Sequence, residues 1–504
     1  MSKKFYITTP LYYVNASPHI GHSYTNIAAD TLARYMRGVL GPENVWFLTG
    51  TDEHGQKIQR AADAQKLTPR EFSDKMALQF KELWRKLEIS YDDFIRTTED
   101  RHIQFVARAL DILKKKGDLY EDKYEGLYCT PCENFWLESQ APDKLCPDCK
   151  RPLEMILEKN YFLDLGKHQA WLMEHIKNNV SFIQPQSRSN EVLRFLELNK
   201  LSPLCISRPK ERLSWGIPLP FSPDHVSYVW FDALLNYTSA VGIFNDSGEY
   251  ESKWWPADLH LIGKDILRHH AIYWPIILHA LGITPPKSIF AHGWWMINQD
   301  KMSKSKGNVV NPLEMVEKFG IDVYRYFLLR DVPFGLDGNF SEEAIIKRFN
   351  GDLANDLGNL VYRTLTMVEK YYAGLVPQIK INEITSDESA QNLKNKIKNL
   401  HQAVYTPLSW PSFDFSSSLE NIWELINMAN KYVEETKPWN LAKENKTEEL
   451  KFFIRLLVEV IRAVADEVEA FMPHTAKRIL EQIGSDTVKK GSPLFPRIDI
   501  KPKG

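Results

Sequence analysis

The residues Asn15-Ala16-Ser17-Pro18-His19-Ile20-Gly21-His22 join two elements of different periodicity. Before them, the apolar run Phe5 to Thr9 predicts a short buried strand, and after them a helical pattern begins near His19 and continues to Gly41. Asn and Pro at the junction favour a turn. Strand, loop and helix in this order predict the first unit of a parallel α/β sheet, with two histidines at the helix start.

A second predicted strand, Val45 to Thr49, runs into the polar segment Gly50-Thr51-Asp52-Glu53-His54-Gly55. Polar groups therefore gather where two strands end, and in an open parallel sheet the ligand binds at that edge. The pattern resumes with a strand at Leu259 to Gly263, a helix at Ile266 to Leu281 and a strand at Ile289 to Ala291. We expect a Rossmann-like, parallel-sheet domain.

The chain, with 504 residues, is too long for one core. Cysteines, prolines and short alternating runs predict a strand-rich insertion at 116–225. Beyond residue 350, apolar residues recur at helical spacing, as in Phe453, Leu457, Val460, Val464, Val468 and Phe471, and predict an α-helical bundle. The expected division is 1–115 and 226–300 for the two halves of the parallel-sheet domain, 116–225 for the insertion, 301–350 for the segment that begins with a lysine-rich run, and 351–504 for the bundle.

Composition is that of a globular protein, with 43% hydrophobic and 25% charged residues and a net charge of −2. Any binding of RNA would therefore depend on local patches of positive charge rather than on the charge of the whole chain. Apolar stretches fall far short of the roughly 20 residues that span a bilayer. The first residues resemble neither a signal peptide nor a presequence, so we expect a cytoplasmic protein. Nothing resembling a further basic module follows the bundle, which favours a monomer.

Two short motifs carry groups suited to the phosphates of ATP. His19 and His22 share the first turn of a predicted helix, where free amides and the positive end of the helix dipole lie, and Gly21 allows close approach to the backbone. Far along the chain, Lys301-Met302-Ser303-Lys304-Ser305 predicts a cationic loop. Either motif alone is compatible with an ordinary helix start or a solvated turn, but the pair favours one nucleotide site. The sequence has no GxxxxGK[ST] loop, which argues against P-loop chemistry.

Four cysteines form two pairs, Cys129-Thr130-Pro131-Cys132 and Cys146-Pro147-Asp148-Cys149. Two C-x2-C pairs at this separation allow four thiolates to converge on one tetrahedral Zn²⁺. A redox pair is the alternative, but a closed four-thiolate site predicts a structural zinc that organises the insertion. Cys205 stands apart and is expected to be an ordinary buried thiol.

The two ATP motifs together resemble the paired signatures of class I aminoacyl-tRNA synthetases. Four further segments are similar to segments of methionyl-tRNA synthetases: Thr9-Pro10-Leu11-Tyr12-Tyr13-Val14-Asn15, Gly50 to Gly55, Tyr228-Val229-Trp230-Phe231-Asp232-Ala233 and Gly263-Lys264-Asp265-Ile266. The resemblance covers essentially the whole chain. The resemblance implies that methionine and ATP, with its Mg²⁺, form methionyl-adenylate. The methionyl group would then pass to the terminal adenosine of initiator and elongator tRNA-Met.

The resemblance also implies roles for individual residues. His19, His22, Lys301 and Lys304 would be catalytic, with Lys304 the main transition-state donor, and Gly21, Met302, Ser303 and Ser305 would complete the ATP site. The methionine pocket would comprise Leu11, Tyr13, Trp230, Ala233, Tyr237, Ile266, His270 and Trp274, with Asp52 holding the substrate's ammonium group. Asn359, Arg363 and Trp439 would read the anticodon. By the same resemblance, 1–115 and 226–300 would form the catalytic domain, 116–225 would be a connective insertion, 301–350 would contain the lysine loop and a stem-contact region, and 351–504 would bind the anticodon.

Helical spacing agrees with such a pocket. Trp230, Ala233 and Tyr237 fall at i, i+3 and i+7, and Ile266, His270 and Trp274 at i, i+4 and i+8, so each set predicts one face of a helix. Two such faces would wall a narrow apolar slot that suits an unbranched thioether. From the pattern alone, core aromatics are the simpler interpretation, and the anticodon candidates would be an exposed Arg and a buried Trp in a bundle.

Other interpretations stay open. Isoleucine, leucine or valine synthetases would carry a much larger editing insertion, and a cysteine enzyme would place its zinc ligands beside the amino-acid pocket. A noncatalytic tRNA-binding relative would be expected to have lost histidines or lysines of the two motifs, and all of them are present.

Overall fold

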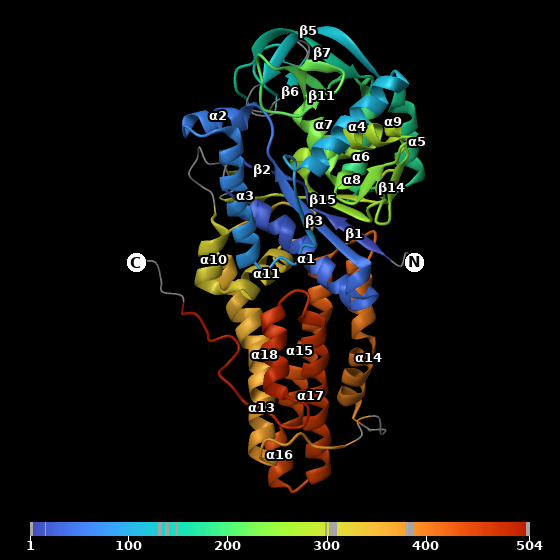
Figure 1. The fold of residues 1–504 in the computed structure, drawn as a ribbon. Helices are drawn as coiled ribbons and strands as arrows, with labels where there is room; N and C mark the ends of the chain where they lie inside the picture. The colour runs from blue at the N-terminus through green and yellow to red at the C-terminus, as the bar shows by residue number, and fades with distance from the viewer. Residues whose placement is uncertain are drawn as a thin grey trace. The chain divides into compact units, whose positions relative to one another are not determined.

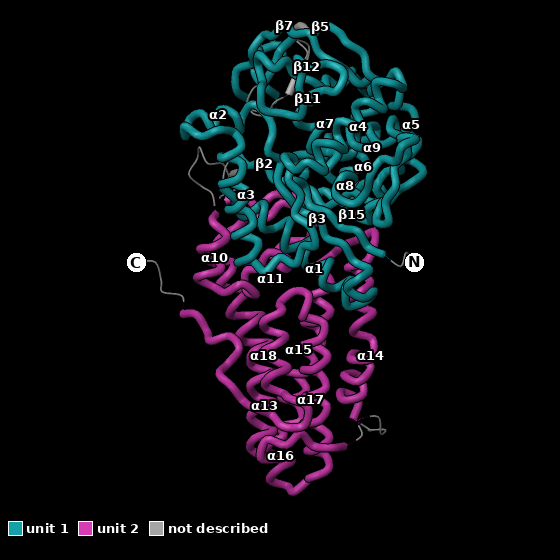
Figure 2. The backbone as a smooth tube through the Cα atoms, in the orientation of Figure 1, with its two compact units in different colours: residues 1–292 teal, residues 293–504 magenta. Residues whose placement is uncertain are grey.

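The computed structural model describes residues 4–15, 17–129, 134–136, 141–147, 150–297, 300–301, 310–379, 381 and 387–499. The chain divides into two compact units, Met1–His292 and Gly293–Gly504, coloured teal and magenta in Figure 2. Each unit buries its own apolar side chains: Tyr6 and Trp274 belong to the core of the first, and Phe453 is fully buried in the second. Within the part of the chain that is described, no helix is both long enough and apolar enough to cross a membrane.

The first unit is built on a seven-stranded sheet (Figure 1). The order is β2 (Tyr12–Tyr13), β3 (Val45–Asp52), β1 (Phe5–Thr8), β15 (Leu259–Gly263), β16 (Ile289–His292) and β8 (Ile183–Gln184), and β4 (Asp93–Arg96) also pairs with β3. All of these pairings are parallel. β1 lies between β3 and β15, and the three strands are parallel. The loops that follow them therefore lie at one edge of the sheet, and sheets of this kind bind ligands at that edge. The predicted α/β class is confirmed.

The helix after β1 forms where the sequence predicts it. α1 spans Ile20–Leu40, with His19 as its N-cap and Gly41, at φ 90°, as its C-cap. β3 continues three residues past its predicted end, to Asp52. A Cβ on Gly50 would lie 1.9 Å from the carbonyl oxygen of Ile95 on β4, so glycine is needed for the two strands to pair at this point.

Helices connect these strands: α2 (Gln56–Ala64), α3 (Pro69–Lys86), α4 (Asp100–Lys116), α7 (Val229–Leu234), α8 (Asn236–Ser239) and α9 (Trp274–Leu281). A small hairpin, β13 (Gly242–Phe244) with β14 (Tyr250–Ser252), lies between α8 and β15 in the chain.

Residues 116–225 contain the strands that the sequence predicts. One sheet has the order β6 (Asn134–Trp136), β5 (Leu119–Cys129), β7 (Glu154–Leu163) and β9 (Leu204–Cys205), and a second has β10 (Ser207–Pro209), β12 (Ser222–Ser227) and β11 (Pro218–Leu219). Two helices, α5 (Gln169–Asn178) and α6 (Gln186–Leu198), were not anticipated. Between them β8 joins the parallel sheet beside β16, which buries Ile183 completely. Two residues are too short a run for periodicity to reveal such a strand.

The second unit is mainly helical, with a small sheet of β18 (Asp300–Lys301), β17 (Trp295–Ile297) and β19 (Gly338–Asn339). Its helices are α10 (Pro312–Phe319), α11 (Ile321–Arg330), α12 (Glu342–Arg348), a π-helical segment (Phe349–Gly358), α13 (Asn359–Tyr372), α14 (Glu388–Leu408), α15 (Phe415–Thr436), α16 (Pro438–Lys443), α17 (Thr447–Val468) and α18 (Pro473–Ile483). α14, α15 and α17 pack against one another (Figure 1). The apolar stripe from Phe453 to Phe471 is fully buried, which confirms the predicted bundle.

Candidate functional site

Two stacked imidazoles lie at the start of α1. The ring centroids of His19 and His22 are 3.8 Å apart and the rings are inclined by 24°. Nδ1 of His19 accepts a hydrogen bond from the backbone N–H of Gly21 at 3.1 Å, and Nδ1 of His22 accepts one from the backbone N–H of His19 at 3.2 Å. Because a backbone N–H only donates, each neutral ring carries its proton on Nε2. The pair therefore supplies two N–H donors beside the positive end of a helix.

A third histidine, His292, joins this edge of the sheet. It ends β16, and its Nε2 lies 2.7 Å from Oγ1 of Thr25 on α1. Thr25 donates its own proton to the carbonyl oxygen of Gly21 at 3.1 Å, so Nε2 of His292 is the donor in their contact. Sequence reasoning missed His292. Its place directly after the predicted strand Ile289 to Ala291 is the signal that could have indicated it.

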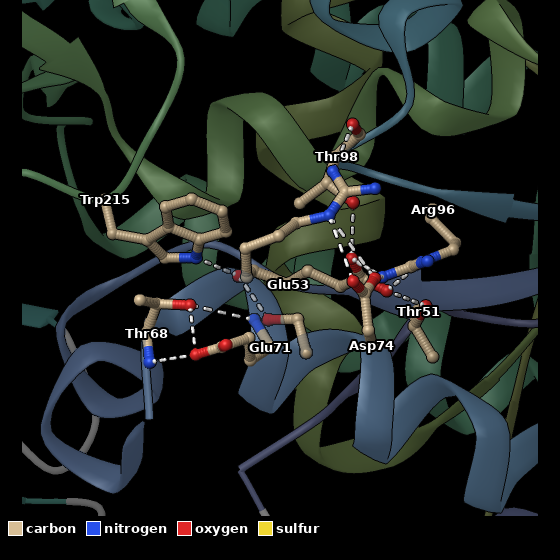
Figure 3. A network of polar contacts seen from close by, with 10 residues as sticks. Thr51, Glu53, Thr68, Glu71, Asp74, Arg96, Thr98 and Trp215 are labelled. Atoms are coloured by element: carbon tan, nitrogen blue, oxygen red, sulfur yellow. Dashed lines mark hydrogen bonds and ion pairs between the residues drawn. The ribbon is translucent and has the colours of Figure 1, made fainter. Parts of the chain in front are cut away.

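The segment that follows β3 is held by a buried carboxylate, Glu53 (Figure 3). Its two oxygens accept hydrogen bonds from Nε and Nη2 of Arg96 at 2.6 and 2.9 Å, and from the hydroxyl of Thr98 at 2.5 Å. Its backbone carbonyl accepts the indole N–H of Trp215 at 2.5 Å. The bidentate guanidinium compensates the cost of burying the charge. The backbone on either side of Glu53 is thereby fixed.

Asp52 and Tyr13, both predicted to contact methionine, are direct neighbours in the sheet. They pair in the register between β2 and β3, and the backbone N–H of Val14 donates to the carbonyl oxygen of Asp52 at 3.2 Å. Asp52 is almost entirely buried. The next histidine, His54, lies with its Nδ1 2.6 Å from a carboxylate oxygen of Asp232 on α7. The end of β3 therefore contacts the segment that carries Trp230 and Ala233.

Three aromatic candidates for the methionine pocket, Tyr237, His270 and Trp274, come together in the first unit. Tyr237 donates its O–H to Nε2 of His270 at 2.8 Å, and its ring lies 5.7 Å from that of Trp274. Nδ1 of His270 donates to the carbonyl oxygen of Ile266 at 2.9 Å, which leaves Nε2 as the acceptor and the ring neutral. Burial lowers the pKa of His270 to about 4 and raises the pKa of Tyr237. Both groups are therefore uncharged at neutral pH.

The remaining candidates lie nearby in the same unit. The ring of Trp230 stacks on His269 with centroids 3.7 Å apart. Leu11 and Ile266 pack against the large core cluster of the first unit, and Ala233 is buried. Leu11 and Ile266 thus lie against the same core that contains Tyr237 and Trp274.

Trp274 is held by His260, which the sequence did not indicate. The indole Nε1–H of Trp274 donates to Nε2 of His260 at 3.2 Å, and Nδ1 of His260 lies 2.7 Å from the hydroxyl of Thr8. The ring of Tyr237 stacks on His260 at 4.2 Å. Burial lowers the pKa of His260 well below its ordinary value, so the ring stays neutral. His260 thus connects the central strands β1 and β15 to the aromatic residues.

The prediction of one regular helix face from Trp230 to Tyr237 is wrong. α7 ends at Leu234, and the side-chain amide of Asn236 donates to the carbonyl oxygen of Ala233 at 2.6 Å. In an α-helix that carbonyl would accept the backbone N–H of Tyr237, so the side chain competes with the helix.

The second expected helix face is also interrupted. Lys264–Ile266 is a 3-10 turn, His269–Tyr273 is π-helical, and the α-helix α9 spans Trp274–Leu281. Pro275 has no N–H to pair with the carbonyl of Ala271, which disfavours an α-helix through this segment. The side chains meet through local departures from helical geometry.

The lysine loop lies mostly outside the described residues. Lys301 is in strand β18 of the second unit, whereas Met302, Ser303, Lys304 and Ser305 are among those not described. Their predicted contact with ATP stays a prediction.

Two of the four predicted zinc ligands are described. Cys129 and Cys146 are buried in one small cluster with Trp136. The carbonyl oxygen of Cys146 accepts the backbone N–H of Lys150 at 2.8 Å, and Lys150 has a φ of 60°. A hydrogen bond that returns to Cys146 in this way is compatible with a metal knuckle. Cys132 and Cys149 lie outside the described residues, and Cys205 is buried as expected.

The anticodon candidates lie at one end of the helical bundle. Asn359 and Arg363 are on α13, and Nη1 of Arg363 lies 3.9 Å from a carboxylate oxygen of Glu434, near the end of α15. α15 leads through Lys437 directly into α16, which carries Trp439. Trp439 is 43% exposed, so the alternative of a buried core tryptophan is wrong.

Comparisons with known proteins agree with this geometry. The family described as "tRNA synthetases class I (M)" matches residues 5–155 and 151–365. A methionine–tRNA ligase of Clostridium tetani is 48% identical over all of this chain and 80% of its own length, and one of Caldanaerobacter subterraneus is 47% identical over 99% of this chain and 80% of its own. The structure of Mycobacterium tuberculosis methionyl-tRNA synthetase in complex with methionyl-adenylate superposes with a TM-score of 0.90 at 37% identity, covering 98% of this chain and all of that one.

Proposed function

The chain belongs to the methionyl-tRNA synthetases of class I, and from this premise we propose how its residues perform the ligase reaction. The enzyme activates methionine with ATP to methionyl-adenylate, releases pyrophosphate, and transfers the methionyl group to tRNA-Met. The substrate carboxylate itself attacks phosphorus, so no side chain acts as a covalent nucleophile. Catalysis consists of positioning and of stabilising charge on the phosphates. The observation that carries the assignment is the match of nearly the whole chain to a solved relative that holds methionyl-adenylate.

Negative charge grows on the phosphates as pyrophosphate leaves. We assign the Nε2–H groups of His19 and His22 to this charge, together with the amides and dipole at the start of α1. Gly21 keeps the backbone open to the nucleotide. Lys304, supported by Lys301, supplies the cationic donors, and Met302, Ser303 and Ser305 complete the loop around ATP. Mg²⁺ accompanies ATP as its counter-ion.

Methionine recognition is assigned to the neighbouring end of the sheet. Asp52 holds the ammonium group. The thioether enters a slot walled by Leu11, Tyr13, Trp230, Ala233, Tyr237, Ile266, His270 and Trp274. The neutral Tyr237–His270 pair supports this role, because an uncharged aromatic wall suits a soft sulfur atom and adds no competing charge.

Recognition of tRNA-Met is assigned to Asn359, Arg363 and Trp439. The exposed indole of Trp439 supports the proposal, because a splayed anticodon base can stack on it, and the two polar side chains can address base edges.

We further propose that Cys129, Cys132, Cys146 and Cys149 bind one structural zinc in a connective insertion at 116–225. The burial of Cys129 and Cys146 in one cluster supports this. Zinc thiolates of this kind persist in a reducing compartment, which supports a cytoplasmic location. The other expected divisions, 1–115 and 226–300 for the catalytic domain, 301–350 for the lysine loop and 351–504 for the anticodon-binding bundle, complete the proposed organisation.

Charging of tRNA tests the function as a whole. The purified chain should attach labelled methionine to tRNA-Met in the presence of ATP and Mg²⁺, and a tRNA-Met with an altered anticodon should be charged far more slowly. Failure to charge tRNA-Met with methionine, by protein whose folding is verified, would overturn the proposal.

A further inference from the structure

A buried carboxylate, Asp232, bridges two histidines from distant parts of the first unit. One oxygen lies 2.6 Å from Nδ1 of His54, which follows β3, and the other lies 2.7 Å from Nε2 of His102 on α4. Asp232 and His102 are fully buried, and His54 nearly so. The bridge joins residues 178 and 130 positions apart in the chain.

The bridge requires an ionised carboxylate. Burial raises the pKa of Asp232, but the two histidines together lower it by more than burial raises it. The pKa of Asp232 therefore lies below its ordinary value. A carboxylate only accepts, so both imidazoles present an N–H toward it. Short hydrogen bonds of this charge-assisted kind are strong and directional, and a carboxylate buried without them would be costly.

The Asp232 bridge joins two segments that carry residues of the proposed methionine site. His54 lies two residues after Asp52, and the intervening Glu53 is held by Arg96. Asp232 lies between Trp230 and Ala233 on the short helix α7. One hydrogen bond therefore connects the backbone that carries the proposed ammonium-binding carboxylate to the segment that carries part of the proposed thioether wall.

We propose that Asp232 is a positioning residue for methionine: through His54 it sets the place of Asp52 relative to Trp230 and Ala233, so that the ammonium and thioether groups are held at once. This inference rests on the proposed methionine site and adds a determinant of its specificity. A site of this kind rejects a ligand of the wrong length, because both ends of the ligand are fixed against one rigid frame.

The test compares two ligands that differ only in the ammonium group. L-Methionine carries both groups, whereas 4-(methylthio)butanoate keeps the thioether and carboxylate but has no amine. Their dissociation constants can be measured by tryptophan fluorescence, since Trp230 and Trp274 are at the site. The variants are His54→Ala, which removes the hydrogen bond, and His54→Asn, whose amide can place an N–H close to the position of Nδ1.

In His54→Ala we expect the dissociation constant for methionine to rise at least tenfold and that for 4-(methylthio)butanoate to change less than threefold. His54→Asn should stay within about threefold of wild type for both ligands. His168→Gln is the matched control: His168 is a buried histidine of the same unit that contacts His279, and its replacement should move neither constant. A purely structural role would lower the melting temperature without separating the two ligands.

Equal weakening of both ligands in His54→Ala, or no weakening of methionine, would overturn the inference. If His54→Ala does not fold, Asp232→Asn carries the test, because it keeps the side-chain volume but cannot accept two N–H groups through two carboxylate oxygens. Methionine should then weaken at least threefold with the analogue unchanged, and any other pattern contradicts the proposal. Wild type that binds no methionine would instead refute the proposed function.

Discussion

The indole N–H of Trp274 donates a hydrogen bond to Nε2 of the buried His260, 3.2 Å away. An indole N–H only donates, so His260 must be neutral, with its own proton on Nδ1 beside Thr8. One neutral imidazole therefore orients an aromatic side chain of the proposed methionine pocket from the centre of the parallel sheet.

Replacement of His260 by Leu should weaken methionine recognition. The buried indole N–H would lose its acceptor, which costs about 1 to 3 kcal/mol, and the ring of Trp274 would be free to turn. We expect a KM for methionine about tenfold higher in pyrophosphate exchange, with the KM for ATP little changed. His260→Gln can place its amide oxygen near the position of Nε2 and should restore most of the loss. A His260→Leu enzyme with a normal KM for methionine would show that the contact has no role.

Loss of the loop lysine should affect chemistry more than binding. Lys304→Ala removes the proposed donor to the developing phosphate charge, and such a donor is worth roughly 2.7 to 4 kcal/mol, or about 10²- to 10³-fold in rate. Single-turnover formation of methionyl-adenylate measures this step, and the KM for methionine should stay near wild type. Lys306→Ala removes the same charge from the same stretch of sequence and should cost less than tenfold. Equal losses in the two variants would argue against a specific role for Lys304.

The free energy of unfolding should decrease on acidification, because a buried neutral histidine such as His270 resists protonation in the folded state. Burial lowers the pKa of His270 to about 4 from its ordinary value of 6.5. Between these values the unfolded chain binds a proton that the folded chain does not, so the free energy of unfolding decreases as pH falls from about 6.5 toward 4, by roughly 1.4 kcal/mol per pH unit for this one group. Below that range the contribution is constant. Denaturant unfolding of wild type and His270→Gln should show a shallower acid dependence in the variant, and parallel curves would contradict the assignment.

Removal of the proposed zinc should destabilise the insertion more than it affects the activation of methionine. Cys132→Ser or Cys149→Ser should abolish bound zinc, lower the temperature of unfolding and slow tRNA charging, because a structural metal contributes directly to folding. Methionine-dependent pyrophosphate exchange should be far less affected. Metal analysis and melting curves measure the first two effects, with Cys205→Ser as the control. Undiminished zinc in both serine variants would refute the four-thiolate site.

Replacement of the proposed anticodon-binding tryptophan should affect tRNA charging and leave amino-acid activation unchanged. Trp439→Ala removes the proposed stacking surface, and stacking on an aromatic side chain is worth about 1 to 3 kcal/mol per base. We therefore expect the KM for tRNA-Met to rise about five- to 150-fold while pyrophosphate exchange is unchanged. Trp410 is another exposed tryptophan of the same unit, at 55% exposure, and Trp410→Ala is the matched control. Equal effects of the two replacements would contradict the assignment of Trp439.

Local signals predicted much of this architecture. The turn at Asn15 to Pro18 and the apolar periodicity after it predicted α1, and the polar residues that follow β3 predicted where the strand ends meet. β8 could not be predicted because its two residues owe their conformation to pairing with β16. The breaks after α7 and before α9 arise from one amide side chain and one proline, whose local effects override the helical spacing.

The polar residues that support the site were beyond sequence reasoning. Asp232 on α7 and His102 on α4 are 130 positions apart, and nothing in a single sequence pairs them. His260 and His292 stand alone in apolar strands, where a lone histidine gives no indication of its partner. The contacting residues carried recognisable motifs, whereas the residues that orient them did not.

Amino-acid-dependent exchange of pyrophosphate into ATP tests the central claim most directly. The purified chain, given each of the twenty amino acids in turn, should catalyse exchange fastest with methionine, and His22→Ala should nearly abolish it. No exchange with methionine, or faster exchange with another amino acid, would contradict the assignment of this chain as a methionine-activating ligase.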